Sequence, residues 1–217
     1  MDRLPCIKGL LFDLDGTLVS TEYRHREIVV GKTLEHFGKG FPSKEILEKF
    51  WFEGNRSRII KEFFELDVLE FWKFYQKYDT PELRKFYTTP FKDVEVLPYF
   101  KEKGYKLGIV TSAPPEIAEI ETEMIGKSLF DKIVVAHSKN GFLPKPNPDG
   151  IIKCLHALSL NNYEAIFIGN SDEDTGAARN ASVTSVHLDR KEYKYENLNP
   201  DFTVSSLYYL KDLLNGN

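Results

Sequence analysis

Features that mark several classes of protein are scarce in this sequence. Only two cysteines, Cys6 and Cys154, occur among the 217 residues, which is too few for a disulfide-stabilised scaffold. We expect both thiols to be reduced and buried, although a disulfide between them remains an alternative. No apolar run approaches the roughly 20 residues of a membrane-spanning helix, and the N-terminus lacks the apolar stretch of a signal peptide. We therefore expect a cytoplasmic protein with no membrane partner.

An excess of charge of either sign is also absent. The 29 basic and 33 acidic residues are interspersed and give a net charge of −4, so we expect no nucleic-acid partner, although a basic patch at a single site remains an alternative. Hydrophobic residues make up 41% of the sequence and no segment has a biased composition, which is typical of an ordered globular protein. A chain of 217 residues can bury one core, or one core and a small accessory domain.

The most informative stretch is residues 7–18, where a short apolar run ends in two carboxylates. Residues 10–12 are typical of a strand that is buried on both faces of a parallel sheet. Asp13 and Asp15 would follow at its carboxyl end, where open α/β sheets bind ligands, and Gly16 would permit a sharp exit. Two carboxylates this close repel each other, and both stay ionised only beside a cation. The pattern favours a hard divalent metal, magnesium above all.

The same residues are also compatible with a simple turn or with a calcium-binding loop. An Asp-Gly pair after an apolar run is often only a turn, and on this stretch alone that alternative stays open. A calcium-binding loop also begins with alternating Asp residues, but it needs a Glu at its twelfth position. Counted from Asp13, that position holds Arg24. A calcium-binding loop is therefore excluded.

The rest of the chain shows two patterns. Residues 20–87 have helical spacing, with Ser43 and Thr80 as caps, and no strand is predicted between residues 20 and 90. The many aromatic residues of this segment would fill a core or line a ligand cage. From residue 91, strands and helices alternate, which predicts a parallel sheet with right-handed crossovers. The predicted helices are 22–37, 43–52, 58–65, 69–78, one from residue 80, 94–103, 115–126, 148–158, 173–180 and 207–214, and the later strands are 106–111, 132–136, 165–168 and 183–187.

These patterns predict an α/β fold with a Rossmann-like parallel sheet core, residues 1–19 and 88–217, and an inserted all-helical cap domain, residues 20–87. The run Asp13-Leu14-Asp15-Gly16-Thr17-Leu18 after a strand resembles the first motif of the haloacid dehalogenase superfamily, most of whose members are magnesium-dependent phosphatases. The chain resembles members of the phosphoglycolate phosphatase and β-phosphoglucomutase type, which have a helical cap after this motif. This likeness covers essentially the whole chain.

The resemblance implies roles for both carboxylates of this motif. Asp13 would be the nucleophile that attacks phosphorus, and Asp15 the general acid and base that protonates the leaving oxygen. Dehalogenases of the family lack the second Asp. Its presence in this chain therefore implies phosphoryl transfer rather than dehalogenation.

A pair of hydroxyl residues follows the predicted strand 106–111. Thr111 and Ser112 precede Pro114 and Pro115, and free backbone N–H groups at such a helix start can bind phosphate. From these residues alone, either hydroxyl could simply cap the helix. The resemblance implies that Thr111 holds a phosphoryl oxygen, and we expect Ser112 to bind substrate beside it.

Lys145 lies between Pro144 and Pro146, which restrict the backbone on both sides. Most surface lysines are solvated and have no specific role, so a single lysine carries little information. This lysine resembles the third motif of the family, in which a lysine pairs with the nucleophile and the transferring phosphoryl group. The resemblance implies a catalytic role for Lys145.

Residues 169–174 resemble the family's metal motif with one departure. The family usually has an Asp directly after the glycine and another four residues later, whereas this chain has Asn170 and Asp174. The resemblance implies that magnesium is bound by Asp13, the backbone carbonyl of Asp15, Asn170 and Asp174. An amide oxygen brings no charge, so we expect the metal to be held less tightly.

The same segment allows two further interpretations. Ser171 and Asp174 have the spacing of a capping box, and acidic residues at a helix start interact favourably with the helix dipole. Both roles are compatible for Asp174, as a cap and as a metal ligand. Asp172 is out of register with the motif and is a reserve candidate for the missing carboxylate.

Two residues of the cap are candidates for substrate contact. Arg56 lies in a Gly-Asn break between predicted helices, where related caps present a specificity loop, and His25 follows the first motif closely. The sequence thus predicts a magnesium-dependent phosphatase, a monomer or homodimer, that hydrolyses a small phosphorylated metabolite through an aspartyl-phosphate intermediate. A sugar phosphomutase of the β-phosphoglucomutase type and a weakly active sensor of a phosphate ligand are the alternatives.

Overall fold

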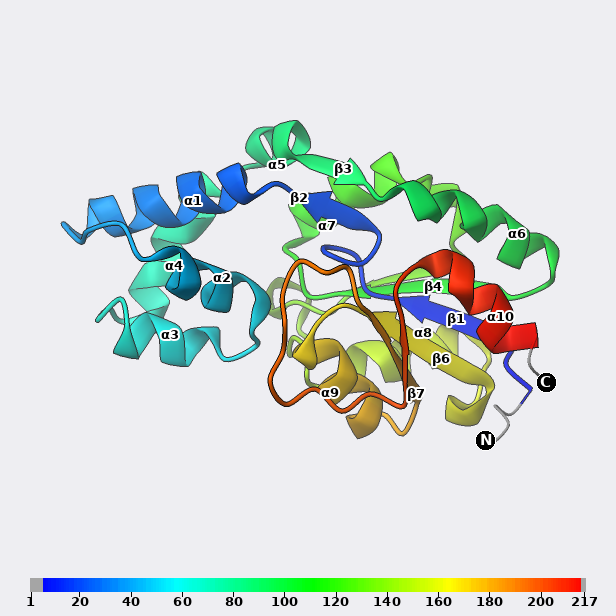
Figure 1. Ribbon diagram of the computed structural model, residues 1–217. Helices are drawn as coiled ribbons and strands as arrows, with labels where there is room; N and C mark the ends of the chain where they lie inside the picture. Colours follow the sequence, from blue (N-terminus) through cyan, green and yellow to red (C-terminus); the bar gives the residue numbers. More distant parts are fainter. Residues whose placement is uncertain (1–5, 216–217) are drawn as a thin grey trace. The chain divides into compact units, whose positions relative to one another are not determined.

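The structure is a computed structural model that describes residues 6–215 (Figure 1). The chain divides into two compact units, the first comprising Met1–Ser20 and Pro90–Asn217 and the second Thr21–Thr89. These divisions lie one residue and two residues from the predicted domain boundaries. Each unit has its own hydrophobic core.

The first unit is built on a parallel sheet. Among residues 6–215 this sheet has six strands, in the order β5 (Lys132–Val135), β4 (Lys106–Thr111), β1 (Gly9–Phe12), β6 (Ala165–Gly169), β7 (Thr184–Leu188) and β8 (Phe202–Val204). All neighbours pair in parallel, and Phe12 of β1 is level with Ile109 of β4 and Ile168 of β6. The carboxyl ends of these three strands therefore meet at one edge of the sheet. The Rossmann-like α/β fold expected from the sequence is confirmed.

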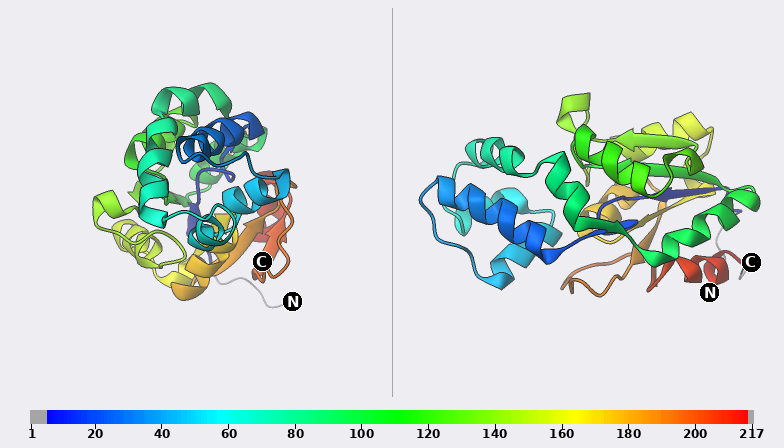
Figure 2. Two further views of the ribbon diagram at one scale, coloured as in Figure 1. Left: turned by 90° about the vertical axis from the view of Figure 1, so that its left-hand side faces the viewer. Right: turned by 90° about the horizontal axis from the view of Figure 1, so that it is seen from above.

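Helices cover both faces of the sheet (Figures 1 and 2). The core on one face includes residues of α6 (Leu97–Glu102), α7 (Pro115–Met124) and α10 (Leu210–Asn215), and the core on the other includes residues of α8 (Asp149–Leu158) and α9 (Asp172–Asn180). Side chains of β1 alternate between them, because Leu10 and Phe12 belong to the first core and Leu11 to the second. All three are fully buried, as predicted for a central parallel strand.

Several short elements were not expected from the sequence. β2 (Val19–Thr21) and β3 (Thr88–Pro90) form a two-stranded sheet at the residues where the chain passes from one unit to the other and back, which corrects the expectation of no strand near the ends of the insert. These strands and β8 have three residues each, too few for apolar alternation to be recognised. Among the described residues, the 3₁₀ helices are η1 (Lys92–Val96), η2 (Lys127–Leu129), η3 (Ser138–Asn140), η4 (Asn162–Glu164) and η5 (Leu207–Tyr209). Of these, η1 and η5 overlap the predicted helices 94–103 and 207–214.

The two cysteines are both free, so the alternative of a disulfide between them is wrong. Cys154 is buried in α8, where burial raises the pKa of its thiol to about 12 and keeps it protonated. Cys6 is exposed, because it precedes β1 and lies outside the sheet, which corrects the expectation of two buried thiols. Within residues 6–215, no helix is long and apolar enough to cross a membrane.

The second unit is helical. Its helices are α1 (Tyr23–His36), α2 (Lys44–Phe52), α3 (Arg56–Glu62), α4 (Val68–Tyr78) and α5 (Pro81–Tyr87). Side chains of Ser43, Asp67 and Thr80 accept hydrogen bonds from the first turns of α2, α4 and α5, as predicted for Ser43 and Thr80. The rings of Phe50 and Phe71 lie 5.4 Å apart in the core, and both are almost fully buried. These aromatic residues therefore pack the unit rather than line a ligand cage.

A group of polar residues is also buried in the second unit. The guanidinium of Arg84 donates to both carboxylate oxygens of Asp79, at 2.8 and 3.1 Å. His25 Nε2 lies 3.1 Å from the same carboxylate, and Arg84 also donates to the hydroxyl of Thr21 at 3.3 Å. Burial alone would raise the pKa of Asp79, but Arg84 and His25 outweigh this effect and hold that pKa well below its ordinary value. The carboxylate is therefore charged in the folded protein.

Asp79→Asn should destabilise the protein strongly, because it leaves the buried guanidinium of Arg84 without its counter-charge. We expect the free energy of unfolding at pH 7 to fall by about 3–5 kcal/mol, the range for removing one partner of a buried ion pair. A depressed pKa means that the pair stabilises the fold above the pKa of the unfolded carboxyl, about 4, and loses this effect as the pH falls toward the lower folded value. The difference between wild type and variant in urea unfolding should shrink below about pH 4.

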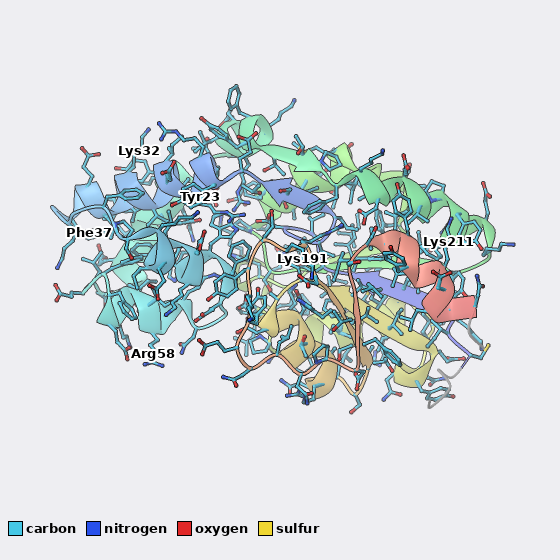
Figure 3. All side chains as sticks on the ribbon, in the orientation of Figure 1. Tyr23, Lys32, Phe37, Arg58, Lys191 and Lys211 are labelled. Carbon is cyan, nitrogen blue, oxygen red and sulfur yellow. The ribbon has the colours of Figure 1, made fainter. Side chains whose placement is uncertain are left out.

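Glu62→Gln is the matched control for this experiment. Glu62 pairs with Arg58 at 2.7 Å, but both side chains are more than half exposed, and Figure 3 shows Arg58 pointing outward from the helices. Exposed ion pairs contribute roughly 0–1 kcal/mol, so this variant should unfold almost like the wild type. Equal losses for the two variants would show that the buried pair contributes no more than a surface pair.

Candidate active site

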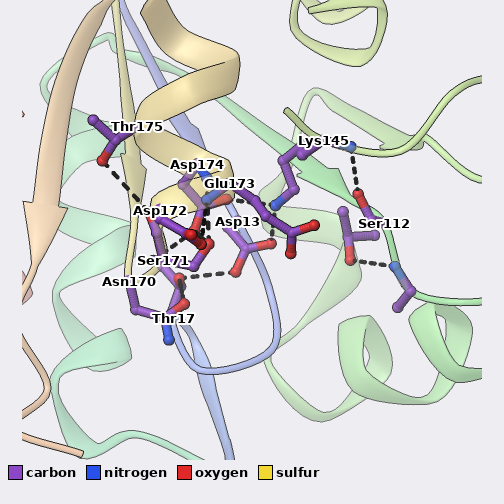
Figure 4. Close-up of polar contacts among 12 residues, drawn as sticks. Asp13, Thr17, Ser112, Lys145, Asn170, Ser171, Asp172, Glu173, Asp174 and Thr175 are labelled. Atoms are coloured by element: carbon purple, nitrogen blue, oxygen red, sulfur yellow. Dashed lines mark hydrogen bonds and ion pairs between the residues drawn. The ribbon is translucent and has the colours of Figure 1, made fainter. Parts of the chain in front are cut away.

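The ends of neighbouring strands bring the predicted site residues together. Asp13 follows β1, Thr111 ends β4 and Asn170 follows β6, and β1 lies between the other two strands. The N–H of Asp13 donates to the carbonyl of Ile168 at 2.9 Å, so the hydrogen bonds between β1 and β6 continue to the first residue of the site. Figure 4 shows Asp13 close to Asn170 and Asp174 at this edge.

The ammonium of Lys145 lies between two carboxylates. It donates to Oδ1 of Asp13 and, at 2.6 Å, to Oδ1 of Asp174, and all three residues are at most 6% exposed (Figure 4). Burial alone would lower the pKa of Lys145, but the two carboxylates outweigh it and raise that pKa. Burial, and then the nearby charge of Asp174, raise the pKa of Asp13 against the opposing effect of Lys145. A cation of the protein itself therefore balances part of the negative charge at this site.

Asp174 is held in place by a reciprocal cap at the start of α9. Its Oδ2 accepts from the N–H of Ser171 at 2.9 Å and from the Ser171 hydroxyl at 2.6 Å, so the predicted capping box is confirmed. Cap and site use different oxygens, because Oδ1 faces Lys145. Gly169 makes room for this carboxylate, since a Cβ there would lie 2.3 Å from the Cγ of Asp174. A side chain at residue 169 would displace the carboxylate from the site.

Thr17 links two strand ends of the site, although no role was expected for it from the sequence. Its fully buried hydroxyl lies 2.9 Å from Oδ2 of Asp13 and 3.1 Å from Oδ1 of Asn170. A hydroxyl has one proton and cannot donate fully to both oxygens. Gly16 precedes it with φ +83°, and a Cβ there would lie 2.3 Å from Nδ2 of Asn170. In the sequence, the only indication of a role for Thr17 was its position directly after the Asp15-Gly16 pair.

The side-chain oxygen atoms of Asp13 and Asn170 around the Thr17 hydroxyl suit a hard cation. Oδ2 of Asp13 and Oδ1 of Asn170 converge on one hydroxyl, and Asp174 contacts the same ammonium as Asp13. Carboxylate and amide oxygens are donors that magnesium accepts in proteins. In the described part of the chain, no group of three or more His, Cys, Asp or Glu side chains is arranged to hold a metal, so a cation would depend on Asn170 and on backbone or solvent oxygens. The residues fit magnesium with few charged ligands.

Thr111 and Ser112 do not cap the following helix, which rules out that alternative. The residue before α7 is Pro114, and no side chain caps this helix. Instead the hydroxyl of Thr111 accepts from the N–H of Ala113 at 3.1 Å, and the hydroxyl of Ser112 accepts from the N–H of Lys145 at 3.0 Å (Figure 4). Ser112 thus holds the backbone that carries Lys145. Phosphate binding by Thr111 and substrate binding by Ser112 stay predictions.

The other predicted residues lie in two places. Asp15 is partly buried in the turn after β1, and Asp172 is the first residue of α9. Arg56 and His25 belong to the second unit, where Arg56 donates to a backbone carbonyl of α2 at 3.3 Å and His25 is buried beside Asp79. Contact of Arg56 and His25 with substrate stays a prediction, as does metal binding through Asp15.

Comparisons with known proteins point to one family. The sequence profile of the haloacid dehalogenase-like hydrolases matches residues 10–188. The chain is 29% identical over 215 residues to pyrophosphatase PpaX of Halalkalibacterium halodurans, covering 96% of this chain and 97% of that protein. It is 28% identical over 208 residues to phosphoglycolate phosphatase of Aquifex aeolicus, covering 92% of each.

The fold is shared with solved structures as well. A protein of Clostridium acetobutylicum described as a predicted phosphatase, 24% identical, superposes with a TM-score of 0.82 over 97% of this chain and all of that one. The family profile covers most of the chain, from β1 to the end of β7, and therefore includes every strand that contributes to the site. The chain is thus a member of the haloacid dehalogenase-like hydrolase family, as the motif around Asp13 predicted.

Proposed function

We propose that the protein is a magnesium-dependent phosphatase that hydrolyses a small phosphate ester through an aspartyl-phosphate at Asp13. The observation that carries this proposal is the placement of the Asp13 carboxylate, at the end of the central strand between the ammonium of Lys145 and the hydroxyl of Thr17. Carboxylates form covalent intermediates of this kind in phosphoryl transfer. The family of the chain and a relative named phosphoglycolate phosphatase support the same reaction class.

In the first step, a carboxylate oxygen of Asp13 forms a bond to phosphorus while the bond from phosphorus to the leaving oxygen breaks. Lys145 stabilises the negative charge on the transferring group, and the hydroxyl of Thr111 holds one of its oxygens. Asp15 donates a proton to the leaving alkoxide. The step leaves the phosphoryl group on Asp13 and releases the alcohol.

In the second step, Asp15 accepts a proton from a water molecule whose oxygen attacks phosphorus. The bond between Asp13 and phosphorus breaks, which releases inorganic phosphate and restores both carboxyl groups. Asp13, the carbonyl of Asp15, Asn170 and Asp174 would hold magnesium, which supplies positive charge beside the phosphoryl oxygens. Burial of Asp13 limits the access of bulk water to the acyl phosphate.

The names of relatives suggest two classes of substrate. The name phosphoglycolate phosphatase indicates a small phosphorylated acid, and the name pyrophosphatase PpaX indicates pyrophosphate, so pyrophosphate hydrolysis is the second candidate function. Both substrates carry a second anionic group beside the phosphoryl group that is transferred. The same residues would also serve a phosphomutase, which differs by returning the phosphoryl group to a sugar instead of to water.

Release of inorganic phosphate tests this proposal. The protein would be incubated with phosphoglycolate, pyrophosphate, β-glucose 1-phosphate and p-nitrophenyl phosphate, each with excess magnesium and with EDTA. We expect magnesium-dependent release from at least one phosphate ester, whereas release from pyrophosphate alone would favour the second candidate. An isomerised sugar phosphate without free phosphate would establish a mutase. No turnover of any substrate would favour a sensor of a phosphate ligand.

Asp13→Asn should abolish turnover while the protein stays folded, because the covalent route needs a carboxylate at this position. We expect a loss of roughly 10³-fold or more in kcat, measured on the best substrate of the screen. Asp149→Asn is the matched control, since it makes the same chemical change at an exposed residue of α8 and should keep activity. A folded Asp13→Asn protein with more than a few per cent of wild-type activity would contradict the mechanism.

Asn170→Asp should tighten magnesium binding, because it adds a negative charge beside a dication. We expect the half-saturating magnesium concentration to fall roughly tenfold, within the range for one added charge at short distance. Asn162→Asp is the control, since Asn162 lies in η4 at the opposite end of β6 and adds the same charge away from the site. If Asn170→Asp leaves the half-saturating concentration unchanged or raises it, Asn170 is not a ligand, and Asp172 becomes the residue to test.

A further inference from the structure

Arg190, in the loop between β7 and β8, has a buried side chain beside an exposed neighbour. Its side chain is 8% exposed, whereas that of Lys191 is 76% exposed. One terminal nitrogen, Nη1, donates to Oδ2 of Asp93 at 2.7 Å, and the other, Nη2, donates to the backbone carbonyl of Thr17. The guanidinium carbon lies 3.8 Å from the centre of the Phe91 ring. Arg190 thus joins two segments that are far apart in the sequence.

Asp93 anchors the guanidinium of Arg190. The oxygen that accepts from Arg190 also accepts from the hydroxyl of Ser206 at 2.7 Å and from the N–H of Leu207 at 2.8 Å. Burial alone would raise the pKa of Asp93, but these donors outweigh it and lower that pKa. Asp93 lies in η1, and Ser206 caps η5, so the anchor is tied to two helical segments of the unit. Nη1 of Arg190 is therefore held by an anchored carboxylate, while Nη2 binds the carbonyl of Thr17.

The contact with Thr17 reaches the turn that follows the candidate nucleophile. Hydrogen bonds within residues 14–19 close this turn, and Arg190 binds the Thr17 carbonyl from outside it. The hydroxyl of the same Thr17 lies 2.9 Å from Asp13 and 3.1 Å from Asn170. The backbone orientation at Thr17 determines where that hydroxyl points. A group that fixes this carbonyl therefore also fixes the hydroxyl between the two strand ends.

We propose that Arg190 is a positioning residue for the reaction, which acts through Thr17 on the orientation of Asp13 and Asn170. This inference rests on the proposed function, in which Asp13 attacks phosphorus and Asn170 helps to hold magnesium. The effect passes through the backbone of Thr17, because Nη2 of Arg190 binds the Thr17 carbonyl while Asp93 holds Nη1. Arginine suits this role because its planar group has two terminal nitrogens in a rigid fork, whereas lysine has one.

Hydrogen exchange tests the positioning without any turnover. In the metal-free protein without substrate, Arg190→Ala should speed amide exchange in residues 14–19 roughly tenfold, because the turn loses an outside restraint. Ser206→Ala is the matched control, since it removes a donor to Asp93 but keeps the contact between Arg190 and Thr17. This control should change exchange in residues 14–19 by less than about twofold. Unchanged exchange in Arg190→Ala would overturn the proposal.

A double-mutant cycle with p-nitrophenyl phosphate at saturating magnesium tests the route through Thr17. Arg190→Ala should lower kcat roughly tenfold and change KM by less than about twofold. Thr17→Val removes the hydroxyl but keeps the shape, and in that background Arg190→Ala should lower kcat by less than about threefold. Equal losses in both backgrounds would show that Arg190 only stabilises the fold and would overturn the proposal.

A second variant covers the case in which Arg190→Ala does not fold. Arg190→Lys keeps a positive charge near Asp93 but lacks the fork. Like Arg190→Ala, it should speed amide exchange in residues 14–19 and lower kcat more in the wild-type background than in the Thr17→Val background. Wild-type exchange in residues 14–19 and wild-type kcat for Arg190→Lys would overturn the proposal. Failure of the proposed function is distinguishable, because it would appear as no turnover of any substrate or as an active Asp13→Asn protein, while the exchange result for residues 14–19 would still stand.

Discussion

A single ammonium group, that of Lys145, holds two buried carboxylates, Asp13 and Asp174, at one edge of the sheet. Without it, the two negative charges would repel each other in a region of low dielectric constant, and burial would drive at least one of them to bind a proton. With it, the end of β1 and the start of α9 are joined to the proline-flanked segment that carries the lysine. The same contact therefore supports both the local fold and the charge of the candidate nucleophile.

Small residues and local caps make this contact geometrically feasible. Gly16 and Gly169 leave the space that the side chains of Asn170 and Asp174 occupy, as the short distances from a Cβ at either glycine show. Ser171 binds the second oxygen of Asp174 and leaves the first for the ammonium. The charged groups of the site are thus oriented by backbone positions that are themselves hydrogen-bonded. A site built in this way needs little rearrangement to present its oxygens to a cation or a phosphoryl group.

Buried charges in the two units are paired in different ways. In the second unit, Arg84 donates to both oxygens of Asp79 and holds segments of the helical core. In the first unit, Arg190 has a buried side chain that donates both to Asp93 and to a backbone carbonyl. Arginine suits both because its fork is rigid and its charge is permanent. The candidate site instead uses a lysine, whose compact charge contacts the carboxylates of both Asp13 and Asp174.

Much of the fold and part of the site could be predicted from the sequence, because those features depend on residues that are close along the chain. The buried strand at residues 10–12 follows from its apolar run, and the capping box at Ser171 follows from a spacing of three residues. The motif around Asp13 predicted the family for the same reason. Three-residue strands such as β8 escaped prediction, since three residues carry too little pattern to identify a strand.

Other features were decided only by the tertiary structure. Thr17 meets Asn170 across 153 residues of sequence, and Arg190 meets Thr17 across 173. Such contacts depend on how strands pair and how loops pack onto them, and no local periodicity encodes them. In the sequence, Arg190 is one charged residue in a run of charged residues. The resemblance implied that Lys145 pairs with Asp13, but nothing in the sequence indicated its second contact, with Asp174. The sequence by itself determined the elements and the chemical groups of this protein, whereas the packing of the sheet determined which of those groups face one another.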